Sequence, residues 1–346
     1  MPAWQRRMME SHPKAATEWK LRPLRELGRP GALTRRIPHL ARRMLQTAYA
    51  RRYIRTFCRG HYDGSFEPNH LAVRVTGPVV TTIHDLSVLD HPEWHPSDRL
   101  ASWENDLPAT LESTTHFVAV SQFTRARMIE RLGISPERIT AIALAARTLQ
   151  LTADFSGRAR AAGLPEAFLL HLGTLEPRKN IPLLLDAWHA LPPQAKSCKL
   201  VLAGGTGWGS EEHYRRLIDH PAGGEVLWAG YVSHEQAAGL LAAARAVLVP
   251  SSYEGFGLPI LEAMAAGAPV ICSTAEAFTE IAGAATERID PADGPAWTAA
   301  IRRGIEDASW REELSRRGRA QAAKFSWQQT ADAHAKLFEL IFAAFA

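Results

Sequence analysis

The chain has 346 residues, of which 46% are hydrophobic and 22% charged. This length and composition predict two globular domains and exclude a disordered or fibrous protein. No stretch has the roughly 18 apolar residues of a membrane-spanning helix, and the N-terminus lacks the apolar run of a secretory signal. We therefore expect a cytoplasmic protein. Its three widely spaced cysteines argue against a disulfide framework.

Charge is distributed unevenly along the chain. Residues 1–60 hold 15 Lys and Arg but only 3 acids, a net charge of +12, whereas the remainder, with 25 basic and 33 acidic residues, carries −8. This asymmetry predicts an anionic partner at the N-terminal end: a phospholipid surface, a lipid phosphate or nucleic acid. No nucleic-acid-binding motif accompanies the charge, so nucleic acid is the least favoured. Apolar residues over 33–49 recur at helical spacing, which fits either a basic amphipathic helix within residues 20–60 on the inner face of the membrane or a surface helix of the first domain.

The predicted elements alternate between short apolar strands and helices. In chain order they are two strands within 71–83, a helix over 100–112, a strand over 116–121, a helix over 122–134, a polar linker over 150–165, and strands over 168–173, 199–205, 225–230, 246–252 and 268–273 with helices between and after them. Such alternation predicts βαβ units and parallel sheets covered on both faces. The fold class is α/β, with two doubly wound domains.

We expect an N-terminal domain over 1–153, beginning with a basic helical region over 1–60, and a second domain over 165–325. A final helix over 326–346 is expected to return to the N-terminal domain. The first clear strand begins near Leu71. The pattern therefore predicts that the first βα unit of the N-terminal domain is missing or replaced by the Arg-rich helices.

The strongest chemical motif is PSSYEGFGLPILEAMAAGAPV, residues 250–270. Glu254 lies in the loop after an apolar strand, and Glu262 follows in the first turn of the next helix. Gly255 and Gly257 permit close approach of a ligand, and the amides at the helix start favour phosphate. Carboxylates beside an anion site should accept hydrogen bonds from sugar or ribose hydroxyls. Alternatively, Glu254 is a solvated loop residue and Glu262 an acid that complements the helix dipole.

A pair of cations follows the strand at 168–173. Arg178 and Lys179 stand after Gly173 and a tight turn, at the carboxyl end of the strand. Arg can bind a diphosphate through two hydrogen bonds and Lys acts as a point charge, and both would stabilise a leaving phosphate. A solvated turn is the alternative.

The second strand predicted within 71–83 ends at His84. We expect the His84 side chain to face the cleft; the alternative is a partly buried histidine with a structural role. His84, His91 and His95 have no nearby Cys and no facing carboxylate, so we predict no metal site there. The glycine-rich segment 204–210 lacks both the third glycine of a dinucleotide fingerprint and the Lys of a P-loop. The chain has no Asp-x-Asp pair either, which fits an enzyme without a metal cofactor.

The spacing of Glu254 and Glu262 around Gly-Phe-Gly-Leu-Pro resembles the E-x7-E signature of glycosyltransferase family 4, whose members are retaining enzymes of the GT-B fold, with two facing Rossmann-like domains and an interdomain cleft. The resemblance covers roughly residues 62–340. It implies that Glu262 holds the nucleotide ribose, that Glu254 approaches the transferred sugar and that His84 lies beside the reactive carbon of the sugar. It also implies further donor contacts, which are Gly173, Arg178, Lys179, Gly230, Tyr231, Val232, Gly255, Phe256, Gly257 and Leu258. Many members carry Arg directly after the first of these glycines, where this chain has Thr174.

The resemblance implies transfer of a hexose from a nucleotide-diphosphate sugar to a glycan or a lipid-linked acceptor in surface polysaccharide assembly. The segment HDLSVLDHPEWHP (84–96) looks like that of mannosyltransferases, so mannose is the expected sugar. Two alternatives stay open: a non-catalytic nucleotide-binding partner protein with a degenerate acceptor domain, and a sugar phosphorylase on the same fold.

Overall fold

The structure is a computed structural model, and it describes residues 22–23, 62–70, 77–147, 155, 159, 163–209 and 211–344. The described residues form two compact units. Unit 1 contains Ala146–Ser252, Leu258–Lys324 and the short N-terminal strand, and unit 2 contains the described part of Arg29–Ala145 together with Tyr253–Gly257 and Phe325 onward. The predicted basic helices within residues 1–60 and the predicted boundary at residue 153 lie outside the described residues.

Unit 1 is built on a seven-stranded sheet with the strand order β1-β8-β7-β6-β9-β10-β11. All neighbouring strands are parallel except β1, which pairs antiparallel with β8. Short, continuous apolar runs suit strands that helices cover on both faces. The strands are β1 (Arg22–Pro23), β6 (Phe168–Leu172), β7 (Lys199–Ala203), β8 (Leu227–Trp228), β9 (Ala246–Val249), β10 (Val270–Ser273) and β11 (Glu287–Ile289).

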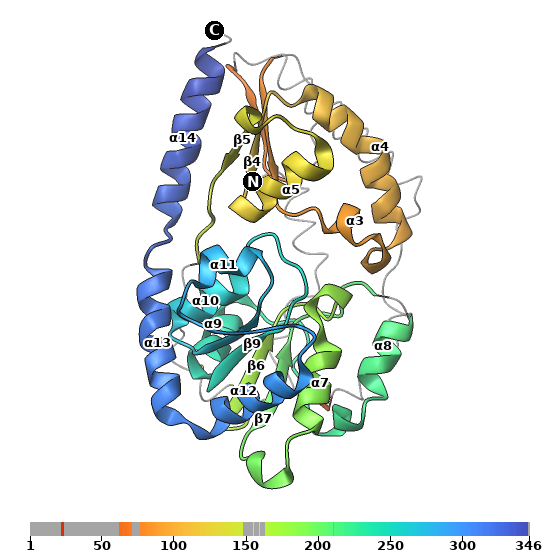
Figure 1. The fold of residues 1–346 in the computed structure, drawn as a ribbon, viewed down its shortest axis with the longest axis vertical. Helices are drawn as coiled ribbons and strands as arrows, with labels where there is room; N and C mark the ends of the chain where they lie inside the picture. Colours follow the sequence, from red (N-terminus) through yellow and green to blue (C-terminus); the bar gives the residue numbers. More distant parts are fainter. Residues whose placement is uncertain are drawn as a thin grey trace. The chain divides into compact units, whose positions relative to one another are not determined.

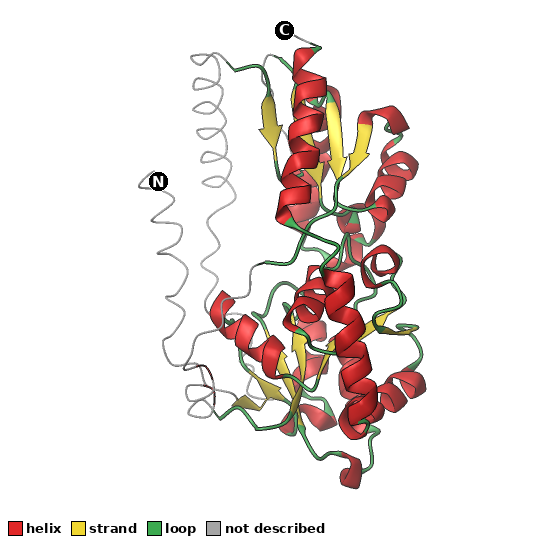
Figure 2. Ribbon diagram, turned by 90° about the vertical axis from the view of Figure 1, so that its left-hand side faces the viewer, coloured by secondary structure: helices red, strands yellow, loops and turns green. Residues whose placement is uncertain are grey.

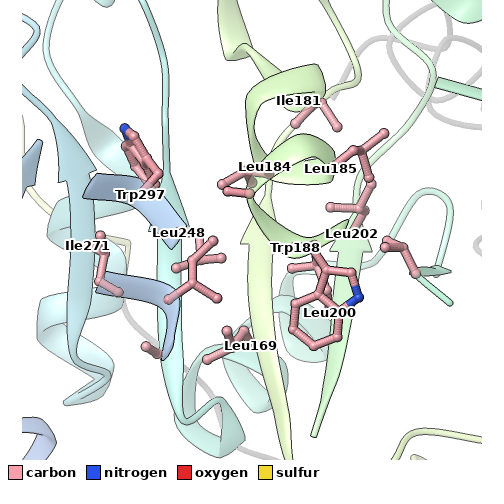
Figure 3. Close-up of a cluster of buried hydrophobic side chains, with 14 of the residues drawn as sticks. Leu169, Ile181, Leu184, Leu185, Trp188, Leu200, Leu202, Leu248, Ile271 and Trp297 are labelled. Carbon is pink, nitrogen blue, oxygen red and sulfur yellow. The ribbon is translucent and has the colours of Figure 1, made fainter. Parts of the chain in front are cut away.

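Helices flank both faces of this sheet (Figures 1 and 2). On one face, alternate strand residues such as Leu169 and Leu248 pack against Leu184, Trp188 and Trp297 from helices α7 and α12 (Figure 3). Helices α9 and α10 contact each other and cover the other face. The helices of the unit are α7 (Ile181–His189), α8 (Glu211–Ile218), α9 (His234–Ala243), α10 (Leu258–Ala266), α11 (Ala277–Ala282), α12 (Gly294–Glu306) and α13 (Ala308–Ala322).

Unit 2 contains a four-stranded parallel sheet with the strand order β2-β3-β4-β5. Its strands are β2 (Ser65–Glu67), β3 (Val79–Ile83), β4 (His116–Ala119) and β5 (Ile139–Ala141), and its helices are α3 (Ser87–Asp90), α4 (Ser97–Ser113), α5 (Gln122–Leu132) and α14 (Trp327–Ala343). One face packs on α4 and α5 through Phe117, Trp103 and Met128. The other face packs on α14, where Leu337 meets Val118.

Two helix ends have clear local causes in the sequence. The Ser121 side chain accepts a hydrogen bond from the Thr124 amide and so caps α5. Gly267 follows the last residue of α10 with a φ of 81°, the left-handed conformation that ends helices and that glycine adopts without strain.

Two short strands were not predicted from the sequence. The parallel partner of β3 begins at Ser65, whereas the strand expected near Leu71 lies outside the described residues. In addition, Arg22 and Pro23 form β1 at the edge of the sheet of unit 1. Both strands are too short for their hydrophobic pattern to be recognised. Pro23 is compatible with β1 because that strand lies at the sheet edge, where a missing N–H is tolerated.

Candidate functional site

The strand order of unit 1 reverses between two adjacent strands. From β6 the chain adds β7 and β8 on one side, and it then continues with β9, β10 and β11 on the other. β6 and β9 are parallel neighbours, so the loops after them leave the sheet at the same edge. Doubly wound sheets bind ligands outside the carboxyl ends of the strands at such a reversal. The loop with the predicted cation pair begins at this position, and so does the stretch Pro250–Ser252 that leads to Glu254.

The loops after β6 and β9 are tied together directly. The Ser252 amide donates to the Arg178 carbonyl at 2.8 Å. Within the strands, Nδ1 of His171 lies 3.0 Å from the Leu248 carbonyl, which can only accept, so Nδ1 carries the proton and Nε2 is the unprotonated nitrogen of the neutral ring. His171 is almost fully buried. These bonds fix the loop with the two cations against the strand that leads to Glu254.

The two predicted phosphate-binding cations differ in their surroundings. Arg178 and Lys179 lie in a short 3₁₀ turn, Pro177–Lys179. Nε of Arg178 lies 2.7 Å from Oε1 of the buried Glu176, so its charge is largely compensated within the loop. The Lys179 side chain is buried, with its Cε next to Gly173. Of the two, Lys179 is the better placed to act as a point charge for an anion at the strand end.

Glycines allow close packing of the loops beside Lys179. A Cβ on Gly204 would lie 1.9 Å from the Gly173 carbonyl oxygen, so only glycine fits. The Gly204 amide donates to the Gly230 carbonyl at 2.7 Å. Gly204 therefore packs against Gly173 at the strand ends, a structural role that requires no dinucleotide-binding motif.

The predicted donor contacts Gly230, Tyr231 and Val232 follow β8. Gly230 has a φ of 68°, Val232 is buried and Tyr231 is exposed. The turn thus exposes the Tyr231 ring to solvent while Val232 packs in the interior. The part of this segment in donor binding stays a prediction.

Glu262 is buried within α10 and carries a counter-ion that the sequence did not reveal. Oε1 lies 2.5 Å from Nε of Arg147 and Oε2 lies 3.2 Å from Nη2, so the guanidinium binds both carboxylate oxygens. Hydrogen bonding to Glu262 raises the pKa of Arg147. No motif or spacing marks Arg147, which follows β5 by six residues, and only tertiary packing brings it to α10.

The loop with Glu254 belongs to unit 2 and is held there at several points. Ser121 Oγ and Thr124 Oγ1 both donate to the Gly255 carbonyl, at 2.5 and 3.0 Å. A Cβ on Gly255 would lie 1.8 Å from the His84 carbonyl oxygen, so the loop packs directly on the residue predicted to lie beside the sugar. Glu254 itself is buried.

Tyr253 anchors the start of the same loop. Its hydroxyl donates to Oδ2 of Asp90 at 3.1 Å, and Asp90 also binds Arg127 and Arg131. Burial, followed by the charge of Asp90, raises the pKa of Tyr253, so the hydroxyl stays protonated and remains a donor. At the other end of the loop, Phe256 is buried with its ring edge-on to Phe325. Gly257, with a φ of 120°, and Leu258 then lead into α10.

His84 has a defined tautomer in its neutral form. Nε2 lies 2.8 Å from the Pro68 carbonyl, so Nε2 carries the proton and Nδ1 is the acceptor. Next to His84, Oδ1 of Asp85 accepts hydrogen bonds from the amide and hydroxyl of Ser87 and so holds the start of α3.

A second histidine beside His84 was missed by the sequence reasoning. The His70 ring lies 5.2 Å from that of His84 and 5.3 Å from that of Trp103, centroid to centroid. Its φ of 58° is unusual for a residue other than glycine, and its Nδ1 is buried with no hydrogen-bond partner in the structure. Burial lowers the pKa of His70 to about 4. Strained, partly satisfied groups of this kind are concentrated at functional sites.

No three His, Cys, Asp or Glu side chains of the described residues are grouped in a way that could hold a metal ion. No helix within the described ranges combines the length and apolar character required to span a membrane.

Two family models match the sequence. The model for group 1 glycosyl transferases matches residues 157–321, and the model for glycosyltransferase family 4 matches residues 12–145. The second match begins at residue 12, so the likeness extends beyond the range 62–340 that the motifs alone indicated.

Individual relatives agree with these matches. An O-antigen chain mannosyltransferase B of Escherichia coli is 37% identical over 313 residues, which are 87% of this chain and 80% of that protein. Sucrose-phosphate synthase of Thermosynechococcus elongatus has a similar structure, with a TM-score of 0.61 and 27% identity over 78% of this chain and 69% of its own. Anabaena HepE in complex with UDP and glucose has a TM-score of 0.64 and 21% identity over 76% of this chain and 72% of its own.

Proposed function

The chain belongs to glycosyltransferase family 4 and has the GT-B fold, and on this basis we propose that it transfers mannose from a nucleotide-diphosphate sugar to a growing surface glycan. The mannosyl specificity and the glycan acceptor are supported by the O-antigen mannosyltransferase that shares 37% of its residues with this chain. The nucleotide donor is supported by the E-x7-E motif and by HepE, a protein of the same fold that binds UDP and glucose.

The observation that carries the proposal is the placement of Lys179 and Glu262 in unit 1. Lys179 is buried at the carboxyl end of β6, and Glu262 is buried one turn into α10, which begins directly after the loop that follows β9. Because β6 and β9 meet at the strand-order reversal, one ligand at that edge can reach both loops. We assign the diphosphate to Lys179 and the amide of Leu258 at the start of α10, and the ribose hydroxyls to Glu262.

In the reaction that we propose, the bond between the anomeric carbon and the diphosphate oxygen breaks while a bond to the acceptor oxygen forms on the same face of the sugar. The acceptor proton passes to the leaving diphosphate, and the configuration is retained. Lys179 stabilises the charge that develops on the diphosphate. Glu254 and Nδ1 of His84 accept hydrogen bonds from hydroxyls of the transferred sugar.

We propose that no metal cofactor takes part. The positive charge of Lys179, together with backbone amides at the start of α10, offsets the negative charge of the diphosphate in its place. The inferred acceptor is a glycan or a lipid-linked glycan. Residues 20–60 would bring the enzyme to an anionic membrane surface, at the inner face of which a lipid-linked acceptor is presented.

The alternative is a non-catalytic nucleotide-binding partner with a degenerate acceptor domain. It rests on the apparent absence of the first βα unit. This alternative predicts nucleotide binding without transfer, and a phosphorylase predicts turnover that depends on inorganic phosphate.

The proposal is tested by incubating the full chain with UDP-, GDP- and ADP-sugars and an oligomannose acceptor, with separation of the products by chromatography. We expect transfer from one mannosyl donor. Lys179→Ala should lower kcat/KM by about a hundredfold, as is typical for loss of a group that stabilises transition-state charge. Glu254→Gln should lower kcat by a similar factor.

Lys196→Gln and Glu225→Gln are matched controls. Nζ of Lys196 lies 2.7 Å from Oε2 of Glu225, and this ion pair is remote from the carboxyl ends of the strands. The loss of either side chain should therefore leave the rate of transfer unchanged. Unchanged rates in both Lys179→Ala and Glu254→Gln would reject the site assignment.

A further inference from the structure

Glu262, which we propose as the ribose ligand, is already engaged in the structure. Nε of Arg147 lies 2.5 Å from Oε1, and Nη2 lies 3.2 Å from Oε2. The guanidinium therefore binds both oxygens in the parallel, two-bond geometry that makes Arg–carboxylate pairs strong. Both residues belong to unit 1.

The two partners differ in their exposure to water. The Glu262 side chain is 5% exposed, whereas that of Arg147 is 50% exposed. A buried carboxylate without a partner is costly, so Glu262 requires a donor at all times. Arg147 can instead be hydrated when it leaves. The carboxylate of Glu262 can therefore stay in place while the guanidinium of Arg147 is replaced by another hydrogen-bond donor.

The donors that could replace Arg147 are hydroxyl groups. An ionised carboxylate is purely an acceptor, and a vicinal diol offers two O–H donors to its two oxygens. These are the same two acceptors that Arg147 binds. Ribose and the fork of Arg147 would thus compete for one carboxylate.

We propose that Arg147 is the resident counter-ion of Glu262 in the donor-free enzyme and that the ribose of the donor displaces it. This inference rests on the proposed function. Arg147 keeps Glu262 satisfied and oriented while the site is empty, and it returns when the nucleotide leaves. The displacement reduces the affinity for any nucleotide that carries both ribose hydroxyls. Arg147 is therefore a positioning residue that favours product release.

The test is calorimetric titration of the full chain with UDP, GDP and ADP, each paired with its 2′,3′-dideoxy analogue. For the ribonucleotide that binds, Arg147→Gln should lower Kd about fivefold, the factor that corresponds to about 1 kcal/mol for a partly exposed ion pair. The dideoxy analogue cannot donate to Glu262, so its Kd should not change. In a Glu262→Gln background, Arg147→Gln should have no effect.

Arg302→Gln is the matched control, because Arg302 is similarly exposed, at 56%, and pairs with Glu306 on the surface of α12. It removes the same charge from unit 1 and should leave both values of Kd unchanged. Arg147→Lys keeps a cation but loses the two-bond geometry, so it should lower Kd about twofold; it also provides a readout if Arg147→Gln does not fold.

A higher Kd in Arg147→Gln would mean that Arg147 binds the nucleotide itself, and an unchanged Kd would mean that the ion pair does not compete. Either result overturns the inference and leaves the proposed function standing. If the wild-type protein binds none of the three nucleotides, the proposed function and the inference both fail.

Discussion

Three charged side chains of unit 1, those of Glu176, Lys179 and Glu262, are buried, and each is stabilised differently. Glu176 pairs with Arg178 inside one loop, whereas Glu262 pairs with Arg147 from a distant part of the chain. Lys179 is buried with an aliphatic stem that packs beside Gly173. A buried ion pair is weak evidence for stability, because desolvation offsets much of the attraction. The position of these residues beyond the ends of β6 and β9 is consistent with the ligand site that we propose.

His70 predicts a loss of stability at low pH. Burial lowers the pKa of His70 to about 4. The charge of Asp85 raises this pKa, whereas His84 and Arg99 lower it further. Between about pH 6.5 and 4 the unfolded chain binds a proton at this site and the folded chain does not, so the free energy of unfolding falls as pH falls. The full difference is about 3 kcal/mol below pH 4.

We expect His70→Asn to reduce this pH dependence, because Asn accepts the positive φ but does not titrate in this range. The measurement is Tm by calorimetry at intervals from pH 4 to pH 8. Burial also lowers the pKa of His116 and His213, so part of the slope should persist in the variant. Parallel curves for the two proteins would contradict the assignment to His70.

The loop 253–257 is the element on which the site depends most. Tyr253 holds its start, Ser121 and Thr124 hold its middle and Phe256 fills its end. Glu254 is thus fixed by its neighbours, since the backbone on either side cannot move independently. Positioning of this kind matters because a displacement of about 1 Å at a reacting centre can cost a hundredfold in rate.

Gly255→Ala should therefore abolish most of the activity without unfolding the protein. The new Cβ would lie 1.8 Å from the His84 carbonyl oxygen, and because backbone atoms cannot rotate away, the loop must shift. We expect kcat/KM to fall by about a hundredfold or more, with an unchanged circular dichroism spectrum. Gly294→Ala at the start of α12 is the control, since its Cβ would meet nothing within 4 Å. Full activity in Gly255→Ala would show that the loop tolerates displacement.

At the scale of the whole molecule, charge is segregated along the chain. Residues 1–60 carry +12 and the rest −8, so the net charge of +4 conceals two regions of opposite sign. Such a basic region is attracted to anionic lipids at roughly 1 kcal/mol for each Lys or Arg near the surface, and this attraction is screened by salt.

We expect the full chain to sediment with vesicles that contain phosphatidylglycerol but not with vesicles of phosphatidylcholine alone. Binding should weaken steeply between roughly 50 and roughly 500 mM salt, because the Debye length falls over this range and the attraction to the lipids is screened. A variant with Arg35, Arg36, Arg42 and Arg43 changed to Gln should bind less at every salt concentration. Equal binding to both kinds of vesicle would exclude an electrostatic mechanism.

Much of the fold, and the family, could be predicted from the sequence alone. Continuous apolar runs predict buried parallel strands because both faces of such strands are covered, and most of the observed strands lie within the predicted ranges. The spacing of Glu254 and Glu262 identified the family because the motif requires residues that are close in sequence. The short strands β1 and β2 escaped because two or three residues show no periodicity.

Other features were decided only by the tertiary structure. Arg147 meets Glu262, which lies 115 positions away in the sequence, and Ser121 meets Gly255, which lies 134 positions away. The unusual φ of His70, its contact with His84 and the pairing of Arg178 with Glu176 likewise depend on how the chain is packed. Such contacts join residues that no local pattern relates, since hydrophobic periodicity specifies which face of an element is buried but not which polar side chains meet there.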